Sequence, residues 1–220
     1  MAGEKFVKVW DLPTRLFHWL MLLTVGFSWW SAEIGHMDWH TRSGIAALIL
    51  LVFRLIWGVI GSSTARFANF VRAPAAVFAH LRRPGNAIHT PGHNPLGGYS
   101  VVAMLLALAA QVGTGLFAVD VDGIESGPLS YLVSFDQGRT AAAVHHISFS
   151  VLQVLVVLHV LAIIYYRIRG RRLVMPMLTG RDGQVAARFG SLTGGGPLRA
   201  FIALAVALLL GWWISAGAPL

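Results

Sequence analysis

The 220-residue sequence contains no cysteine and few charged residues. The absence of cysteine excludes disulfides, iron–sulfur clusters, thiolate zinc sites and haem attached covalently through a C-x-x-C-H motif. Charged residues make up 12% of the chain, whereas an ordinary soluble domain carries about a quarter. Hydrophobic residues, in contrast, reach 56%. This composition predicts a protein whose solvent is lipid.

The sequence contains several long apolar runs with few charged residues. Five runs approach the ~20 residues that cross a hydrocarbon core of ~30 Å. They cover residues 16–30, 44–60, 99–119, 141–166 and 200–216. A backbone in lipid must satisfy its own hydrogen bonds, so each run is expected to form an α-helix. The sequence therefore predicts an all-α integral membrane protein, with a transmembrane four-helix bundle in residues 1–180 and a linker plus a fifth transmembrane helix in residues 181–220.

The charge of the chain is +8 at neutral pH, and its distribution predicts the orientation in the membrane. Basic residues concentrate before the first run, between the second and third runs, and between the fourth and fifth. The other two loops are acidic, with Arg42 and Arg139 as their only basic residues. Because cytoplasmic loops carry the excess of Lys and Arg, we expect a cytoplasmic N-terminus and a C-terminus outside. The basic loops then face anionic lipid, and no nucleic-acid partner is expected.

The fourth run contains three histidines, His145, His146 and His159, in an otherwise almost wholly apolar segment. A helix turns about 100° and rises about 1.5 Å per residue. His145 and His159 therefore lie about 40° apart around the helix and about 21 Å apart along it, whereas His146 and His159 differ by about 140°. A single intramembrane histidine is equally well explained by a hydrogen bond to a neighbouring helix. Two in register favour a functional role, because ionisable groups in a membrane are costly.

Two more histidines lie at matching depths on other runs. His18 is level with His159 near the cytoplasmic side, and His40 is level with His145 near the outer side. Neutral imidazole is a strong axial haem ligand, and one histidine pair in each leaflet is what two stacked bis-histidine haems require. Without cysteine these would be non-covalent b haems, with their iron bound by His18, His40, His145 and His159.

Arg54 supports the same interpretation. It follows His40 by 14 residues, so it lies on the same helical face at the depth of the inner haem. A buried guanidinium needs an anion, and a haem propionate would supply one. Gly44, one turn after His40, would let a flat ring approach the backbone, although helix packing explains this glycine equally well.

The sequence also contains the motifs VWDLPTRLFHW, FRLIWGVIGS, ARFANFV, GHNPLGG and TGLF, together with the pair His145 and His159. In this combination it resembles the bacterial cytochrome b561 family over about residues 6–180, and most closely the branch grouped with the cytochrome b subunits of nickel–iron hydrogenases. The resemblance implies that His18, His40, His145 and His159 bind two b haems. It also implies that electrons pass between a periplasmic partner and the quinone pool of the bacterial inner membrane.

In the family a glutamate often follows the ligand histidine of the second and fourth helices, but here Thr41 follows His40 and His146 follows His145. The role of that glutamate is therefore not carried over. His93, in the motif GHNP, is a candidate contact to the propionates of the inner haem or to a quinone; the alternative is a helix-entry residue that bonds backbone or headgroups.

We therefore expect a di-haem b-type cytochrome that transfers electrons between a periplasmic redox partner and quinone. Three assignments stay open: an anchor subunit of a hydrogenase or another dehydrogenase, a quinone reductase fed by a c-type cytochrome, and a superoxide-oxidising quinone reductase. The acidic loop of residues 120–139 argues mildly against capture of the superoxide anion. Quinone oxidoreductase activity and homo-oligomers also stay open. The alternative from another class is a histidine-lined metal or proton transporter, but no spanning run contains the Asp or Glu that it would need.

Overall fold

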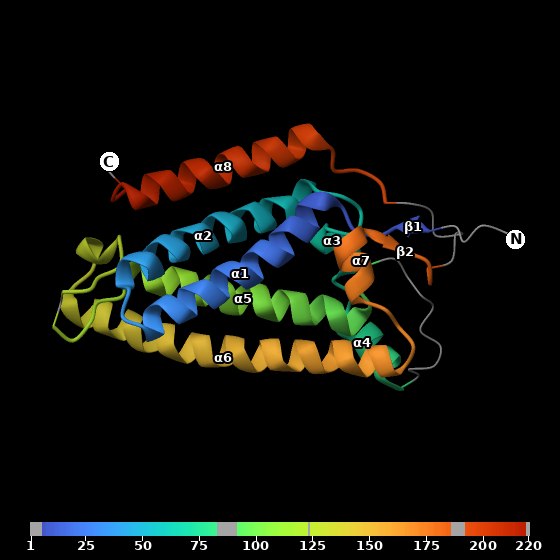
Figure 1. Ribbon diagram of the computed structural model, residues 1–220, viewed down its shortest axis with the longest axis horizontal. Coiled ribbons are helices and arrows are strands. Elements are labelled where there is room, and N and C mark those ends of the chain that lie inside the picture. The colour runs from blue at the N-terminus through green and yellow to red at the C-terminus, as the bar shows by residue number, and fades with distance from the viewer. Residues whose placement is uncertain (1–5, 83–91, 123, 186–191, 219–220) are drawn as a thin grey trace, which may run out of the picture.

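The computed structural model describes residues 6–82, 92–122, 124–185 and 192–218, and five long helices dominate it. These helices are α1 (Leu12–Glu33), α2 (Met37–Ile60), α5 (Pro95–Phe117), α6 (Phe135–Ile168) and α8 (Pro197–Ser215). All five run roughly along the long axis of the molecule (Figure 1). Four of them, α2, α5, α6 and α8, are long and apolar enough to cross a membrane. The chain is thus a mostly helical membrane protein, as the composition predicted.

The first predicted span, residues 16–30, lies inside α1, which is not among those four helices. Arg15, His18 and three tryptophans make α1 less apolar than the others, although its 22 residues measure about 33 Å. The helix begins at Leu12 because Asp11 caps it: the Asp11 carboxylate accepts a hydrogen bond from the backbone N–H of Thr14 at 2.6 Å. With a length of about 33 Å, α1 would suffice for a fifth span across a hydrocarbon core of ~30 Å.

Short elements gather mainly at the end of the bundle where α1 begins (Figure 1). They are β1 (Val7–Lys8), α3 (Phe67–Phe70), α4 (Pro74–Arg82), α7 (Val174–Thr179) and β2 (Arg181–Asp182). The strands β1 and β2 pair antiparallel, so the segment before α1 is tied to the segment after α7. At the opposite end, the 3₁₀ turn η2 (Ser130–Leu132) lies in the loop between α5 and α6.

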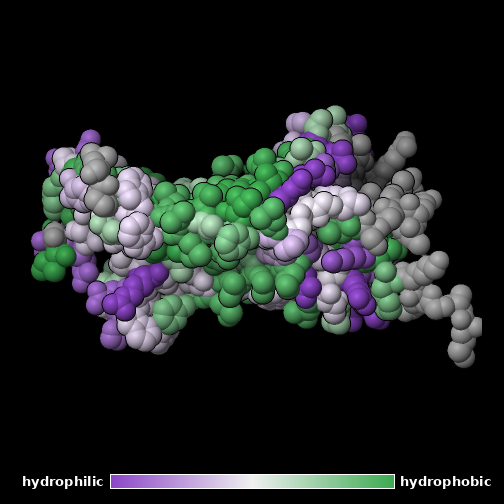
Figure 2. Space-filling view, turned by 90° about the horizontal axis from the view of Figure 1, so that it is seen from above, coloured by the Kyte–Doolittle hydropathy of each residue, from purple (hydrophilic) through white to green (hydrophobic). Residues whose placement is uncertain are grey.

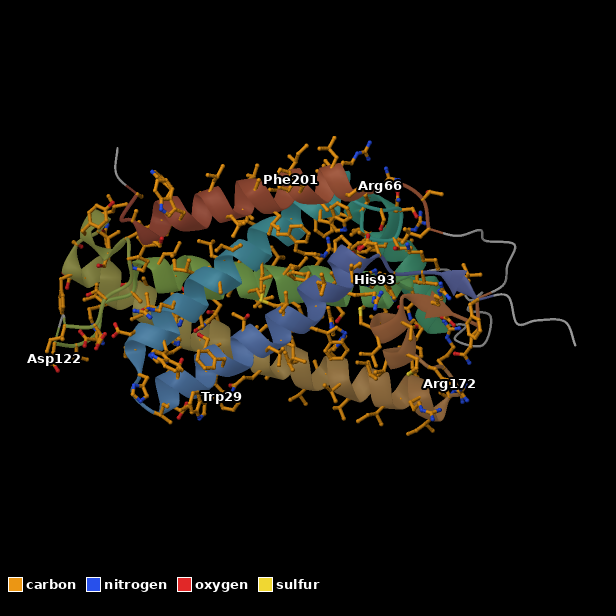
Figure 3. The ribbon with its side chains drawn as sticks, turned by 45° about the horizontal axis from the view of Figure 1, so that its top comes forward. Trp29, Arg66, His93, Asp122, Arg172 and Phe201 are labelled. Carbon is orange, nitrogen blue, oxygen red and sulfur yellow. The ribbon has the colours of Figure 1, made fainter. Side chains whose placement is uncertain are left out.

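The long helices pack as two hairpins, α1 with α2 and α5 with α6, and α2 also contacts α5. The fifth helix, α8, packs on α2 and lies on the far side of it from α6 (Figures 1 and 3). Small residues make this contact close: Ala203 and Ala207 are 0% exposed, and a Cβ on Gly211 would lie 2.4 Å from Ile49 Cγ1. Such a stripe of small residues lets two helices approach in lipid.

Hydropathy along the long axis follows the arrangement expected in a membrane. Figure 2 shows hydrophobic residues gathered in the middle of one face and hydrophilic residues toward both ends. Figure 3 shows Arg66 and Arg172 at one end of the bundle and Asp122 at the other. On the face shown, an apolar middle therefore lies between two polar ends, which is the pattern of a spanning protein.

Candidate functional site

The structure brings the four predicted histidines together in two facing pairs. The ring centres of His18, on α1, and His159, on α6, are 6.4 Å apart. Those of His40, on α2, and His145, on α6, are 6.0 Å apart. All four rings are half-buried, whereas His146 is exposed. The pairs are those that helical depth predicted.

An apolar cluster lies between the two pairs. Leu152 is midway along α6 between His145 and His159, and it is 4% exposed. It packs in one cluster with Met21 of α1 and with residues of α2 and α5. Fourteen residues of helix separate the pairs by about 21 Å, so each pair lies toward a different end of the bundle.

The spacing of the rings suits a metal held between two imidazoles. A metal–imidazole bond is about 2.0–2.1 Å long, so a metal bound by one nitrogen of each ring separates the ring centres by roughly 6 Å. Among the described residues, no three His, Asp or Glu side chains come together as a bare metal ion would need. Two imidazoles are enough for haem iron, because the protein supplies only the axial ligands. The donor set therefore fits haem.

Backbone carbonyls orient the outer pair, His40 and His145. Nδ1–H of His40 donates to the carbonyl oxygen of Ser28 at 2.9 Å, and Nδ1–H of His145 donates to that of Gln111 at 2.8 Å. Each ring then carries its lone pair on Nε2, which is how an outer partner fixes the tautomer of a ligand histidine. These carbonyls provide an orienting contact in a chain that has no glutamate after either histidine.

Gln111 and Gly115 of α5 shape the surroundings of His145. The side-chain amide of Gln111 donates to Nε2 of His145 at 2.9 Å, and its oxygen accepts a hydrogen bond from Ser148. Iron bound at that Nε2 therefore requires the amide to turn away. A Cβ on Gly115 would lie 2.9 Å from Cε1 of His145, so the ring needs a glycine there. Beside His40, a Cβ on Gly44 would meet no heavy atom of the described residues within 4 Å, which fits the approach of a flat ring.

The inner pair is accompanied by buried polar groups that lack partners. Nδ1 of His18 is buried and makes no hydrogen bond within the described part of the chain. Arg54 is 2% exposed, and its Nη1 likewise makes no hydrogen bond to any described residue. Its guanidinium lies 5.9 Å from the ring centre of Phe17 and 4.8 Å from that of Phe67. A cation enclosed by aromatic rings fits an anionic partner such as a haem propionate.

His93 belongs to this inner group. Its ring lies between Trp10 and Phe70, with ring centres 4.8 Å and 4.5 Å away. Burial lowers the pKa of His93 to about 3, and nearby Arg54 and His159 contribute. The ring is therefore neutral at pH 7. Its Nδ1 is buried and makes no hydrogen bond within the described residues, so it could still bond a ligand.

The carboxylate of Asp11 holds the inner end together, a role that the sequence did not reveal. Besides capping α1, it accepts hydrogen bonds from Nε1 of Trp57 at 3.1 Å and from the hydroxyl of Ser62. Asp11 is 6% exposed. These bonds fix the helix that carries His18 to the helix that carries Arg54, and they compensate the burial of the carboxylate.

A model of one protein family, described as prokaryotic cytochrome b561, matches residues 9–180. The chain belongs to the prokaryotic cytochrome b561 family. This confirms the predicted family and its hydrogenase-related branch. The cytochrome is accordingly a membrane protein of electron transfer that binds haem b. The match covers every candidate site residue but not α8, and comparison with curated proteins and with solved structures finds no match.

Proposed function

We propose that this cytochrome holds two b haems, one between His18 and His159 and one between His40 and His145. The observation that carries the proposal is the pair of ring separations near 6 Å at two depths of one bundle. When bound, haem supplies reversible one-electron chemistry. The residues of this chain do the rest: four imidazoles hold the iron, two carbonyls orient the outer ligands, and Arg54 pairs with a propionate of the inner haem.

His93 is the second polar candidate beside the inner haem. Its neutral ring can donate or accept a hydrogen bond, and its buried Nδ1 supports a contact to a propionate or to a quinone carbonyl. The match of residues 9–180 supports a haem-binding unit in residues 1–180, while residues 181–220 form the linker and α8.

The orientation proposed for the chain places the N-terminus in the cytoplasm and the C-terminus in the periplasm, across a bacterial inner membrane. Support comes from the arginines that lie at the α7 end and the acids at the opposite end, because positive loops stay inside. In this orientation α1 is a fifth span. The pair His18 and His159 then lies near the cytoplasm, and the pair His40 and His145 near the periplasm.

Electrons would pass between a periplasmic redox protein and the quinone pool through the two haems. The acidic residues of the loop between α5 and α6 favour a partner with a basic contact face, such as a c-type cytochrome or a hydrogenase or dehydrogenase subunit, over the superoxide anion. Membership of a cytochrome family favours electron transfer over the metal or proton transporter.

Redox titration of single histidine variants tests the proposal. His40→Ala and His145→Ala should each remove one haem with the same midpoint potential, and His18→Ala and His159→Ala should each remove the other. His146→Ala, in the exposed neighbour, is the matched control and should keep both haems. Loss of a haem in the His146 variant, with both haems kept in the His145 variant, would contradict the assignment.

A further inference from the structure

Two arginines and several apolar side chains line a groove of about 560 Å³ between the last turns of α6 and the start of α7. Ile163 and Arg167 come from α6, Arg172 from the connecting segment, and Val174 and Met175 from α7. Figure 3 shows Arg172 at this end of α6. The groove thus combines apolar walls with two cationic groups where a spanning helix reaches its end.

Hydrogen bonds from other segments hold both walls of the groove. Gly170 has φ +82°, which lets the chain reverse after α6. Gln184 braces this turn, because its oxygen accepts from the backbone N–H of Arg172 at 2.9 Å and its amide donates to the carbonyl of Gly170 at 2.8 Å. α7 is fixed to α1, since Nε of Arg15 donates to the carbonyl of Met177 at 3.3 Å. The groove is therefore built into the fold.

The charges of the groove call for an anion. Arg167 and Arg172 are exposed, and within the described part of the chain neither guanidinium forms an ion pair or a side-chain hydrogen bond. Guanidinium groups bind phosphate through paired hydrogen bonds. A free phosphate would leave the apolar walls uncovered, however, and a neutral lipid would leave the arginines without a counter-charge.

We propose that the groove binds an anionic phospholipid. Its phosphate contacts Arg167 and Arg172, and an acyl chain lies along Ile163, Val174 and Met175. Basic pockets beside spanning helices recognise lipid headgroups in this way. Ile163 follows His159 by one helical turn, so the bound chain would run beside the inner histidine pair.

Lipid counting on the purified holoprotein tests this site. The protein is delipidated in neutral detergent, dioleoyl phosphatidylglycerol or dioleoyl phosphatidylcholine is added, and bound lipid is measured by native mass spectrometry. Each arginine near an anionic headgroup raises the binding constant roughly fivefold. Phosphatidylglycerol should therefore bind about 25-fold more tightly than phosphatidylcholine. The double variant Arg167→Gln/Arg172→Gln should lose this preference.

The matched control is Arg72→Gln/Arg82→Gln, which removes the same charge from two exposed arginines outside the groove. It should keep the preference, and unchanged haem spectra show that each variant is folded. If the groove double variant does not fold, Met175→Glu, which places an acid in the groove, should lose the preference instead. Equal binding of the two lipids, an equal loss in the control, or displacement of the lipid by inorganic phosphate or by a short-chain quinone would overturn the proposal.

Discussion

Replacing Gly115 with alanine should weaken the outer haem site and leave the inner site intact. The added Cβ would lie 2.9 Å from Cε1 and 3.1 Å from Nδ1 of His145, whereas ordinary contact begins at 3.4 Å. The ring must therefore move by about 0.5 Å, away from the position in which Nδ1–H donates to the carbonyl of Gln111. Loss of such an orienting bond lowers metal affinity by about 10–100-fold, so we expect a similar loss for the outer haem.

Gly113→Ala is the matched control for this variant. Gly113 lies in the same helix two residues earlier, and a Cβ there would meet no heavy atom within 4 Å in the described part of the chain. Both changes replace a helical glycine by alanine and gain about 0.8–1 kcal/mol in helix propensity, so effects on folding cancel in the comparison. Haem content and redox titration of the purified proteins give the result. Equal haem content and equal potentials in the two variants would show that the ring of His145 does not need a glycine at position 115.

Substitutions at three further positions test other parts of the structure. Arg54→Leu should lower the midpoint potential of the inner haem alone, on the order of tens of millivolts, because an unpaired propionate favours ferric iron, and Arg54→Lys should restore most of the shift; movement of the outer haem's potential would contradict this. Asp11→Asn should cost about 1.5–3 kcal/mol of stability, measured by thermal unfolding, because the hydrogen bonds to its charged group weaken. Gly211→Leu should destabilise by about 1–3 kcal/mol through overpacking against Ile49 with both haem spectra unaltered, and a spectral change would show that α8 reaches the haem sites.

The sequence predicted the parts of the fold that depend on long periodic patterns. Each apolar run lies largely within a helix, because a backbone in lipid has few alternatives. The 14-residue spacing of His145 and His159 predicted that they share one helical face, since helix geometry is regular over that distance. Matching depths predicted their partners, His40 and His18, and the ring separations agree. The same geometry places His146 off the face that carries His159, and its side chain is exposed.

The contacts around the histidines could not be predicted from the sequence in the same way. The carbonyls of Ser28 and Gln111 orient two rings, but every residue carries a carbonyl, so no residue type marks them. The need for glycine at position 115 arises from a ring on another helix and appears only once α5 and α6 are packed. Gln111 could have been noticed in the sequence, because it is an amide inside an apolar run.

The contacts of Asp11, at the inner end of the bundle, could not be predicted from local sequence either. Its position beside Leu12 and Pro13 is typical of a helix start, but its bonds to Trp57 and Ser62 join segments about fifty residues apart. The strands β1 and β2 have two residues each, too few for any alternation to predict. Short elements of this kind are defined by tertiary contacts and not by local sequence.

The ratio of haem b to polypeptide in the purified protein is the decisive measurement for a site with two haems. A pyridine haemochrome assay measures the haem, and quantitative amino-acid analysis measures the chain. Because the histidines face each other in two pairs at two depths, we expect about two b haems per polypeptide. A ratio of one in protein purified without loss of haem, or the absence of a b-type spectrum, would contradict it.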